Sequence, residues 1–228
     1  MNIKIQGFLG NLHSWSLVNQ NIARALIKKG HKADLQSTNG YEYFPEDLKP
    51  FIVQNLKSEY DCQISYTALK NFPIYLKHGD KNRFGIWNYE FTILPKGFAK
   101  YYKFCDKFLP SSNFSKNIFK ENGIPESHME VIPHGIDMED FKNAIPYKLK
   151  TNKKYKILAN IAQPHLRKNL PGLLEAYGRA FNKNDDVCLV LKVVRKKPTQ
   201  SFEVSFDDIY LEFKKKYRNH AETEIIEE

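Results

Sequence analysis

The chain has 228 residues, of which 42% are hydrophobic and 14% aromatic, so it can bury the core of one large or two small globular domains. Its formal net charge of +9 is spread over both halves. This charge indicates either a lysine-rich solvated surface or a protein that is attracted to phosphates, nucleic acid or an anionic membrane. Because no motif typical of nucleic-acid recognition accompanies the charge, we do not expect a nucleic-acid partner.

The cysteine pattern and the lengths of the apolar runs indicate the cellular compartment in which we expect the protein. The three cysteines, Cys62, Cys105 and Cys188, are far apart and form no C-x-x-C pair. Their spacing argues against a disulfide framework and a structural zinc site, so we expect a reducing, cytoplasmic setting. The segment Met1–Phe8 carries few apolar residues, and no run of about 18 apolar residues occurs, so we expect neither a signal peptide nor a transmembrane helix.

The first forty residues have the pattern of a βαβ unit. Asn2–Phe8 alternates as a strand, Gly7 and Gly10 bracket a turn, and an amphipathic helix runs up to Gly30, which suits the residue after a helix end. A second strand, His31–Gln36, follows. This order predicts a doubly wound α/β fold with a glycine loop at the carboxyl end of the first strand, where such folds bind ligands.

The glycine loop lacks the G-x-G-x-x-G spacing, so a dinucleotide fingerprint is absent. His13, Ser14 and Trp15 lie on it or directly after it. Two interpretations remain open: the loop contacts a ligand, or it is a tight turn with a half-buried tryptophan.

A carboxylate ends the next clear strand pattern. Arg83–Glu90 reads R-F-G-I-W-N-Y-E and alternates large apolar residues before Glu90. The carboxyl end of a strand is the edge at which α/β enzymes place their chemistry, which makes Glu90 a candidate catalytic residue. The alternative is a solvated loop glutamate. Lys107–Pro110 is predicted as a short strand, followed by a helix capped by Ser111-Ser112.

The segment Pro95–Phe104 is predicted as a helix that is both aromatic and basic. It carries Phe98, Tyr101, Tyr102 and Phe104 beside Lys96, Lys100 and Lys103. Core packing is the common reason for such aromatics. The alternative is peripheral contact with anionic lipid, as interfacial helices make.

The stretch Glu130–Phe141 reads as the exit from a first domain. Val131–Ile132 is predicted as a short strand that ends at Pro133, because proline has no N–H to donate. Acidic residues after the His134-Gly135 turn suit a helix N-terminus. The polar run that follows predicts domains 1–141 and 155–228 joined by a hinge, 142–154.

The second domain repeats the strand–helix order. The strands are predicted at Tyr155–Ile161 and Val187–Val194, the helices from Leu170 to Phe181 and at Phe206–Tyr217, with Glu224–Glu228 opening a third unit. Arg167 and Lys168 precede the first of these helices, where backbone N–H groups and two cations can converge on an anion such as a diphosphate. The alternative is a solvated cation pair.

Several of these segments together resemble a known family. They are W-N-Y-E at 87–90, D-K-F-L-P-S-S-N-F-S at 106–115, V-I-P-H-G-I-D at 131–137, R-K-N at 167–169 and L-L-E-A-Y at 173–177. In this order they resemble the retaining nucleotide-sugar glycosyltransferases of family four, which have the GT-B fold of two Rossmann-like domains. The resemblance covers residues 1–195 and implies that the first domain meets the acceptor and the second holds the donor.

The resemblance implies roles for the candidate residues. Arg167 and Lys168 would bind the donor diphosphate, and the loop with Gly10, His13 and Ser14 would face the donor phosphates and sugar. Glu90 would lie near the acceptor as the catalytic residue. The implied substrates are a nucleoside diphosphate sugar and a saccharide or lipid-linked acceptor, with no metal and no cofactor.

Two departures from the family pattern concern the second domain. Gln163 and His165 stand where the family often has a glycine and an arginine, and the family's pair of glutamates seven residues apart has no counterpart after Lys168. The resemblance therefore implies a truncated donor domain, and we expect the chain alone to be inactive or weakly active. The alternative function is a non-catalytic module that binds a glycan or a partner.

Overall fold

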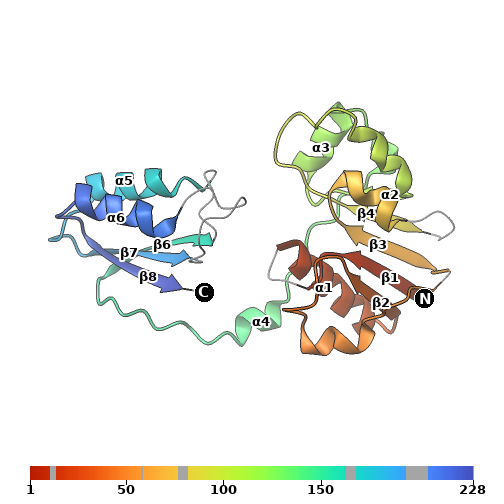
Figure 1. Cartoon of the computed structure of the whole chain (residues 1–228), viewed down its shortest axis with the longest axis horizontal. Helices are drawn as coiled ribbons and strands as arrows, with labels where there is room; N and C mark the ends of the chain where they lie inside the picture. Colours follow the sequence, from red (N-terminus) through yellow and green to blue (C-terminus); the bar gives the residue numbers. More distant parts are fainter. Residues whose placement is uncertain (11–13, 58, 77–81, 163–167, 194–204, 228) are drawn as a thin grey trace. The chain divides into compact units, whose positions relative to one another are not determined.

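The computed structural model describes residues 1–228 except 11–13, 58, 77–81, 163–167, 194–204 and 228 (Figure 1). The chain forms two compact units, Met1–Ala144 and Ile145–Glu228. The expected hinge, 142–154, contains the boundary between them. Within these described ranges, no helix combines the length and the apolar character needed to cross a membrane.

The first unit alternates strands with helices, as the sequence predicts. Its strands are β1 (Asn2–Gly7), β2 (Lys32–Ser37), β3 (Cys62–Tyr66), β4 (Arg83–Ile86) and β5 (Lys107–Leu109). Its α-helices are α1 (Ser14–Lys28), α2 (Phe72–Tyr75), α3 (Asn113–Glu121) and α4 (Met138–Lys142). Four 3₁₀ helices lie among them: η1 (Glu46–Phe51), η2 (Leu69–Asn71), η3 (Ala99–Phe104) and η4 (Glu126–His128).

Local signals set the helix ends. After α1, Gly30 has φ of +84°, a left-handed conformation that other residues adopt only at a cost, and this stops the helix where the sequence predicts. At the start of α3 the hydroxyl of Ser112 accepts a hydrogen bond from the Ser115 N–H at 3.2 Å. The predicted Ser111-Ser112 cap is thus confirmed, with Ser112 as the capping residue.

The five strands form one parallel sheet in the order β2-β1-β3-β4-β5. The strand β1 pairs on one side with β2, where Ile3 lies opposite Ala33, and on the other with β3, where Ile3 lies opposite Cys62. The strand order therefore turns around at β1. In such sheets this reversal opens a crevice outside the carboxyl ends of β1 and β3. This crevice is the usual ligand site of doubly wound folds.

Helices cover both faces of this sheet. On one face Ile3, Ile5 and Leu35 pack with Ala23 of α1, and all four residues are at most 1% exposed. On the other face Phe108 of β5 meets Phe119 of α3, with ring centroids 4.6 Å apart in an edge-on arrangement. Two apolar layers thus hold the sheet in place and leave its carboxyl edge for polar side chains.

The aromatic and basic segment forms the 3₁₀ helix η3 rather than a helix over the whole of Pro95–Phe104. Its aromatic side chains, Phe98, Tyr101, Tyr102 and Phe104, are partly buried and pack against the cluster around Phe108 and Phe119. The core-packing interpretation of these aromatics is therefore confirmed. Lipid contact by the neighbouring lysines stays a prediction.

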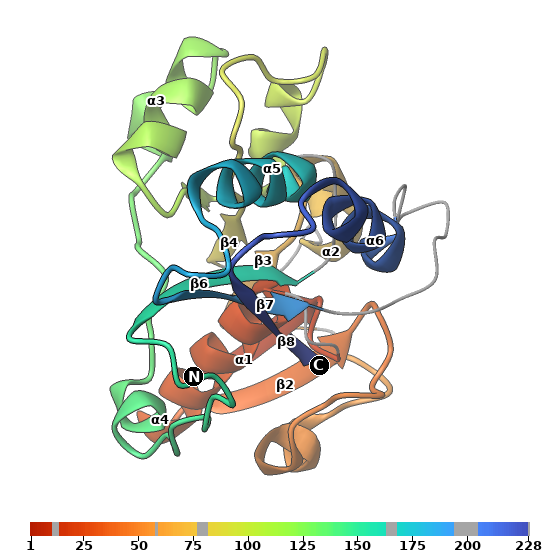
Figure 2. The same ribbon diagram turned by 90° about the vertical axis from the view of Figure 1, so that its left-hand side faces the viewer.

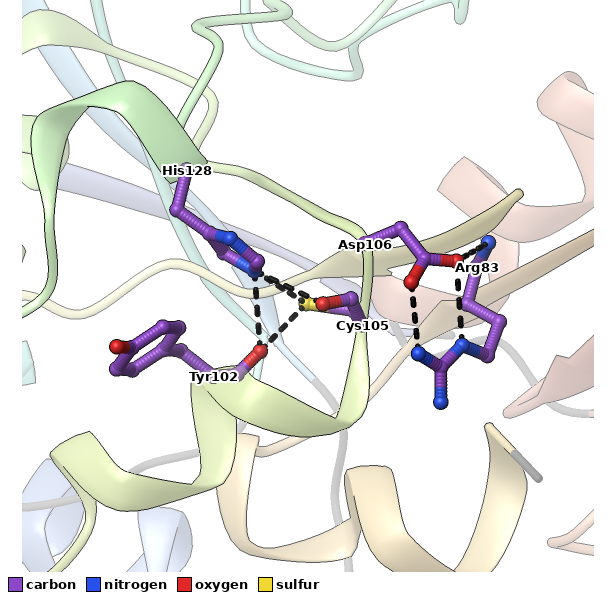
Figure 3. A network of polar contacts seen from close by, with 5 residues as sticks. All are labelled: Arg83, Tyr102, Cys105, Asp106 and His128. Atoms are coloured by element: carbon purple, nitrogen blue, oxygen red, sulfur yellow. Dashed lines mark hydrogen bonds and ion pairs between the residues drawn. The ribbon is translucent and has the colours of Figure 1, made fainter. Parts of the chain in front are cut away.

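Polar contacts fasten η3 and the start of β5 to neighbouring segments (Figure 3). The guanidinium of Arg83 donates to both carboxylate oxygens of Asp106, at 2.7 and 3.1 Å. The Nε2 of His128 lies 2.8 Å from the Cys105 carbonyl and 3.2 Å from the Tyr102 carbonyl. Burial raises the pKa of the Cys105 thiol to about 12, so this cysteine stays protonated and structural.

The exit of the first unit differs from the prediction in one respect. Val131–Ile132 does not form a strand. The segment still runs beside β5, because the N–H of Glu130 donates to the Phe108 carbonyl at 3.1 Å and that of Ile132 to the Pro110 carbonyl at 3.0 Å. The predicted acidic helix start is confirmed: Asp137 caps α4 by accepting from the Glu139 N–H.

The second unit is a smaller α/β layer structure. It contains β6 (Tyr155–Ala162), α5 (Leu170–Ala180), β7 (Val187–Val193), α6 (Phe206–Lys216) and β8 (Glu222–Glu227). The strands are parallel in the order β6-β7-β8, and both helices lie on the same side of the sheet (Figure 2). Leu189 and Leu191 of β7 face these helices and are fully buried.

A buried carboxylate on β8 holds the chain that leads into the second unit. Glu224 is 8% exposed and lies opposite Val190, on the face of the sheet turned away from α5 and α6. Its oxygens accept from the backbone N–H of Lys150, at 2.9 and 3.1 Å, and from that of Thr151 at 2.9 Å. The last residues of the expected hinge are thereby fastened to the second sheet.

We predict that Glu224→Ala destabilises the second unit by about 1.5–3 kcal/mol, because it removes hydrogen bonds to a charged acceptor and leaves the buried N–H of Thr151 unpaired. Glu222→Ala, an exposed carboxylate on the same strand, is the matched control and should change little. Native-state hydrogen exchange of the β7 and β8 amides measures the difference. Equal protection in the two variants would contradict the role of Glu224.

Candidate functional site

A polar cluster of the first unit lies at the carboxyl edge of its sheet. The strands β3, β4 and β5 end at Tyr66, Ile86 and Leu109, and the residues just after them lie at the same edge because the strands are parallel. Asn88 follows β4 by two residues and is half-buried. Its side chain connects three neighbouring chain segments.

Asn88 makes three polar contacts from its amide group. Its Oδ1 accepts from the backbone N–H of Ser111 at 2.8 Å, which identifies the other atom as the nitrogen. That Nδ2 donates to the hydroxyl of Tyr66 at 3.1 Å and lies 3.2 Å from Nε2 of His134. Asn88 thus joins the ends of β3 and β5 to the segment that leaves the first unit.

The contact with Asn88 also sets the state of His134. Because Asn88 Nδ2 can only donate, Nε2 of His134 accepts, and the ring proton is on Nδ1. Burial lowers the pKa of His134 below its ordinary 6.5, in keeping with a neutral imidazole. The site therefore presents a neutral histidine near pH 7.

Aromatic rings continue the cluster toward β1. The Tyr66 ring lies 5.2 Å from the His134 ring and 5.4 Å from Trp15, whose ring is 5.5 Å from that of Phe8. Burial raises the pKa of the Tyr66 hydroxyl, the Asn88 hydrogen bond opposes the shift, and the charge of Glu90 adds to it. Tyr66 therefore stays protonated and is a hydrogen-bonding group rather than a base.

Glu90, the predicted catalytic residue, lies four residues beyond the end of β4. Its carboxylate is exposed to solvent yet close enough to influence Tyr66 electrostatically. The structure therefore places Glu90 at the predicted edge of the sheet. Its role in catalysis stays a prediction.

The glycine loop after β1 is fixed by side chains on both sides. Asn19 Nδ2 donates to the Phe8 carbonyl at 2.9 Å, and Gln20 Nε2 donates to the Leu9 carbonyl at 2.7 Å. The backbone N–H groups of Leu9 and Gly10 donate to Asn39 Oδ1, at 3.1 and 3.2 Å. The loop is therefore held by α1 on one side and by the turn after β2 on the other.

Gly10 has a steric reason to be glycine. A Cβ atom at this position would lie 1.6 Å from the Gly40 carbonyl oxygen, which no side chain can tolerate. Among the other predicted donor-binding residues of this loop, Ser14 is the exposed first residue of α1, and His13 lies outside the described residues. Their contact with a donor stays a prediction.

The predicted phosphate-binding pair belongs to the second unit. Lys168 is exposed and precedes α5 by two residues, with Asn169 capping that helix through a hydrogen bond to the Gly172 N–H at 3.2 Å. Arg167 lies outside the described residues. The predicted residues therefore fall on both units, with Glu90 and Gly10 on the first and Lys168 on the second.

Sequence reasoning missed three members of the first cluster, which are Tyr66, Asn88 and His134. Asn88 and His134 lie inside the motifs W-N-Y-E and V-I-P-H-G-I-D, and each directly follows an apolar stretch. Polar residues just past predicted parallel strands were the available signal.

Comparison with known proteins establishes the fold. No protein-family profile and no curated protein sequence matches the chain. Among solved structures, similarity extends over the whole chain and 69% of Anabaena HepE in complex with UDP and glucose, with a TM-score of 0.67 and 11% identity. The lipopolysaccharide outer core galactosyltransferase WaaB gives a TM-score of 0.59 at 12% identity, with 68% of that chain covered.

A third similar structure is Acinetobacter baumannii MurG, with a TM-score of 0.54, 10% identity and 65% of that chain covered. These structural neighbours are GT-B glycosyltransferases, and at such identities the likeness concerns the fold alone. The predicted fold class, an α/β fold of the GT-B type with two parallel Rossmann-like sheets, is confirmed.

We predict that His134 makes the first unit less stable as the pH falls from 7 to 5.5. Its pKa is lower in the folded than in the unfolded chain, so the unfolded state takes up the proton first and gains stability on acidification. The change His134→Gln should flatten this part of the curve of unfolding free energy against pH. Urea unfolding at several pH values measures it, and an unchanged slope in the variant would contradict the buried, neutral state of His134.

Proposed function

We propose that the chain is a glycosyltransferase, or part of one, that transfers a hexose from a nucleoside diphosphate sugar to a saccharide or lipid-linked acceptor with retention. The observation that carries the proposal is a shared fold together with a polar cluster at the carboxyl edge of the first sheet. The structurally similar HepE has been solved with UDP-glucose, and WaaB is a galactosyltransferase.

In this proposal the first unit binds the acceptor. Glu90 is exposed at the edge of the cluster and can accept a hydrogen bond from an acceptor hydroxyl. Asn88 and Tyr66 fix the position of the neutral His134 imidazole. A sugar hydroxyl entering this edge would meet a carboxylate and uncharged polar groups, which can orient it through hydrogen bonds.

The second unit would bind the donor diphosphate. Lys168 precedes α5, and Arg167 stands next to it in the sequence. Cations beside the N-terminus of a helix stabilise negative charge as it develops on the leaving diphosphate, and such electrostatic help is a large part of many barriers. The proposal needs no metal and no cofactor beyond the nucleotide sugar.

For the first unit, the proposed donor contacts are those of the loop after β1. Ser14 and His13 are its candidate contacts, and Gly10 would act by allowing the close approach of the loop to Gly40. We further propose a cytoplasmic protein that contacts anionic lipid through Lys96, Lys100 and Lys103. The alternative function is a non-catalytic module that binds a glycan or a partner.

The test of the proposal is release of nucleoside diphosphate from a panel of UDP-, GDP- and ADP-sugars, with and without saccharide acceptors. We expect weak donor binding and slow transfer by the 228-residue chain, and faster transfer when a polypeptide that carries a glutamate pair seven residues apart is added. Donor binding without turnover under both conditions would favour the non-catalytic module. Absence of donor binding would contradict the proposed function.

We predict that Lys168→Ala weakens nucleoside diphosphate binding at least tenfold, because a charge-assisted hydrogen bond contributes about 1.5–3 kcal/mol. Glu90→Ala should leave this affinity nearly unchanged, because the residue is assigned to the acceptor. Lys183→Ala, an exposed lysine in the turn between α5 and β7, is the matched control. Equal calorimetric affinities for all three variants would exclude Lys168 as the phosphate ligand.

A further inference from the structure

Hydrogen bonding around Asn88 fixes which ring nitrogen of His134 carries the proton. Asn88 Oδ1 accepts from the Ser111 backbone N–H at 2.8 Å, so the atom that lies 3.2 Å from His134 Nε2 is the amide nitrogen. An amide nitrogen donates and does not accept, so Nε2 supplies its lone pair and the proton of the neutral ring is on Nδ1. The Ser111 backbone therefore sets, through Asn88, the tautomer of His134.

The Nδ1–H group of His134 is available to a ligand. It has no hydrogen-bond partner among the described residues, and the ring is only partly buried. His134 also lines a pocket of about 410 Å³ beside α1, a volume within the range of about 300–1,000 Å³ typical of small-molecule sites. The ring thus presents one N–H donor beside a space that a small molecule can enter.

His134 cannot serve as a general base in this arrangement. Its Nε2 lone pair is engaged by Asn88, and its Nδ1 already carries a proton. Burial keeps the pKa of the imidazole below its ordinary value, so the ring is neutral near pH 7. A ring in this state has no free lone pair for a further proton, and its remaining capacity is to donate one hydrogen bond.

The charge at this edge of the sheet selects the group that fits beside the donor. Burial raises the pKa of Tyr66 most, the charge of Glu90 adds to that shift, and the Tyr66 ring lies 5.2 Å from that of His134. The carboxylate of Glu90 repels a phosphate or a second carboxylate but accepts a hydrogen bond. A hydroxyl group can accept from Nδ1–H and donate to a carboxylate, so an uncharged hydroxyl matches both partners.

We infer that Asn88 is a positioning residue that holds His134 as an Nδ1–H donor, and that this donor binds a hydroxyl oxygen of an uncharged saccharide acceptor. The inference rests on the proposed function for the word acceptor. It deepens that function, because it gives His134 a role in binding the acceptor and excludes an anionic group from this edge of the sheet. Both ends of the Asn88 amide are already bonded, so Asn88 acts through His134.

Asn88→Asp tests the positioning role, because it keeps the shape of the side chain and reverses one hydrogen bond. The carboxylate still accepts from the Ser111 N–H, but it cannot donate to Nε2 of His134. Long-range nitrogen–proton NMR spectra at pH 7 show which ring nitrogen is protonated, and His134→Gln identifies the signals by their loss. We expect the proton on Nδ1 in the unchanged chain and on Nε2 in Asn88→Asp.

Tyr66→Phe is the matched control. It removes the other hydrogen-bond acceptor of Asn88 Nδ2 but leaves the donor to His134 in place, so the proton should stay on Nδ1. A proton on Nε2 in the unchanged chain, or one that stays on Nδ1 in Asn88→Asp, would overturn the positioning role. The first of these results needs no variant, so the test does not depend on whether Asn88→Asp folds.

The ligand is probed by titrating the unchanged chain with methyl glucoside, methyl galactoside and maltose, and with inorganic phosphate as the anionic probe. We expect at least one sugar to shift the Nδ1 signal of His134 and phosphate to leave it unchanged. Asn88→Asp should weaken binding of that sugar about three- to tenfold, as expected for one neutral hydrogen bond.

No response to any sugar, or a response to phosphate alone, would overturn the assignment of His134 to a saccharide hydroxyl. These titrations use no nucleotide sugar and need no turnover. Their failure therefore leaves the donor-release assay to judge the proposed function separately.

Discussion

The pairing of β1 with both β2 and β3 is the constraint on which the first unit depends. Because β1 lies between β2 and β3, the chain leaves β1 toward β2 and later returns to pair with β1 on the other side as β3. This reversal opens a crevice at the carboxyl ends of β1 and β3. The loop after β1 and the residues after β3, β4 and β5 then face one edge. The site residues Tyr66 and Asn88 owe their proximity to this strand order.

Within this edge, Asn88 satisfies the polar groups around it. Its side-chain carbonyl oxygen accepts a hydrogen bond from the Ser111 N–H, and its amide nitrogen donates to the Tyr66 hydroxyl and the His134 imidazole. A half-buried amide with both ends bonded costs little to bury, and its donation to Nε2 of His134 places the proton of the neutral ring on Nδ1. His134 also lines a pocket beside α1, whose walls carry both aliphatic and charged side chains.

The second unit is organised by a different interaction. Its two helices cover one face of the sheet through Leu189 and Leu191, while the opposite face carries the carboxylate of Glu224. A buried carboxylate is stable only when its oxygens accept hydrogen bonds, and here the backbone of Lys150 and Thr151 supplies them. The same contact determines where the incoming chain becomes part of the second unit.

The sequence by itself indicated several of the strands and helices and some of their ends, because those signals act over a few residues. The glycine at Gly30, the serine cap at Ser112 and the acidic start at Asp137 are examples. It also placed Glu90 near a strand end, but it predicted a strand at Val131–Ile132 and a longer helix at Pro95–Phe104 that the structure does not have. Only the tertiary structure brought Asn88 to Tyr66, Ser111 and His134, which are 22, 23 and 46 residues away in the chain. Contacts at such separations follow from strand order and register, which hydrophobic periodicity leaves undetermined.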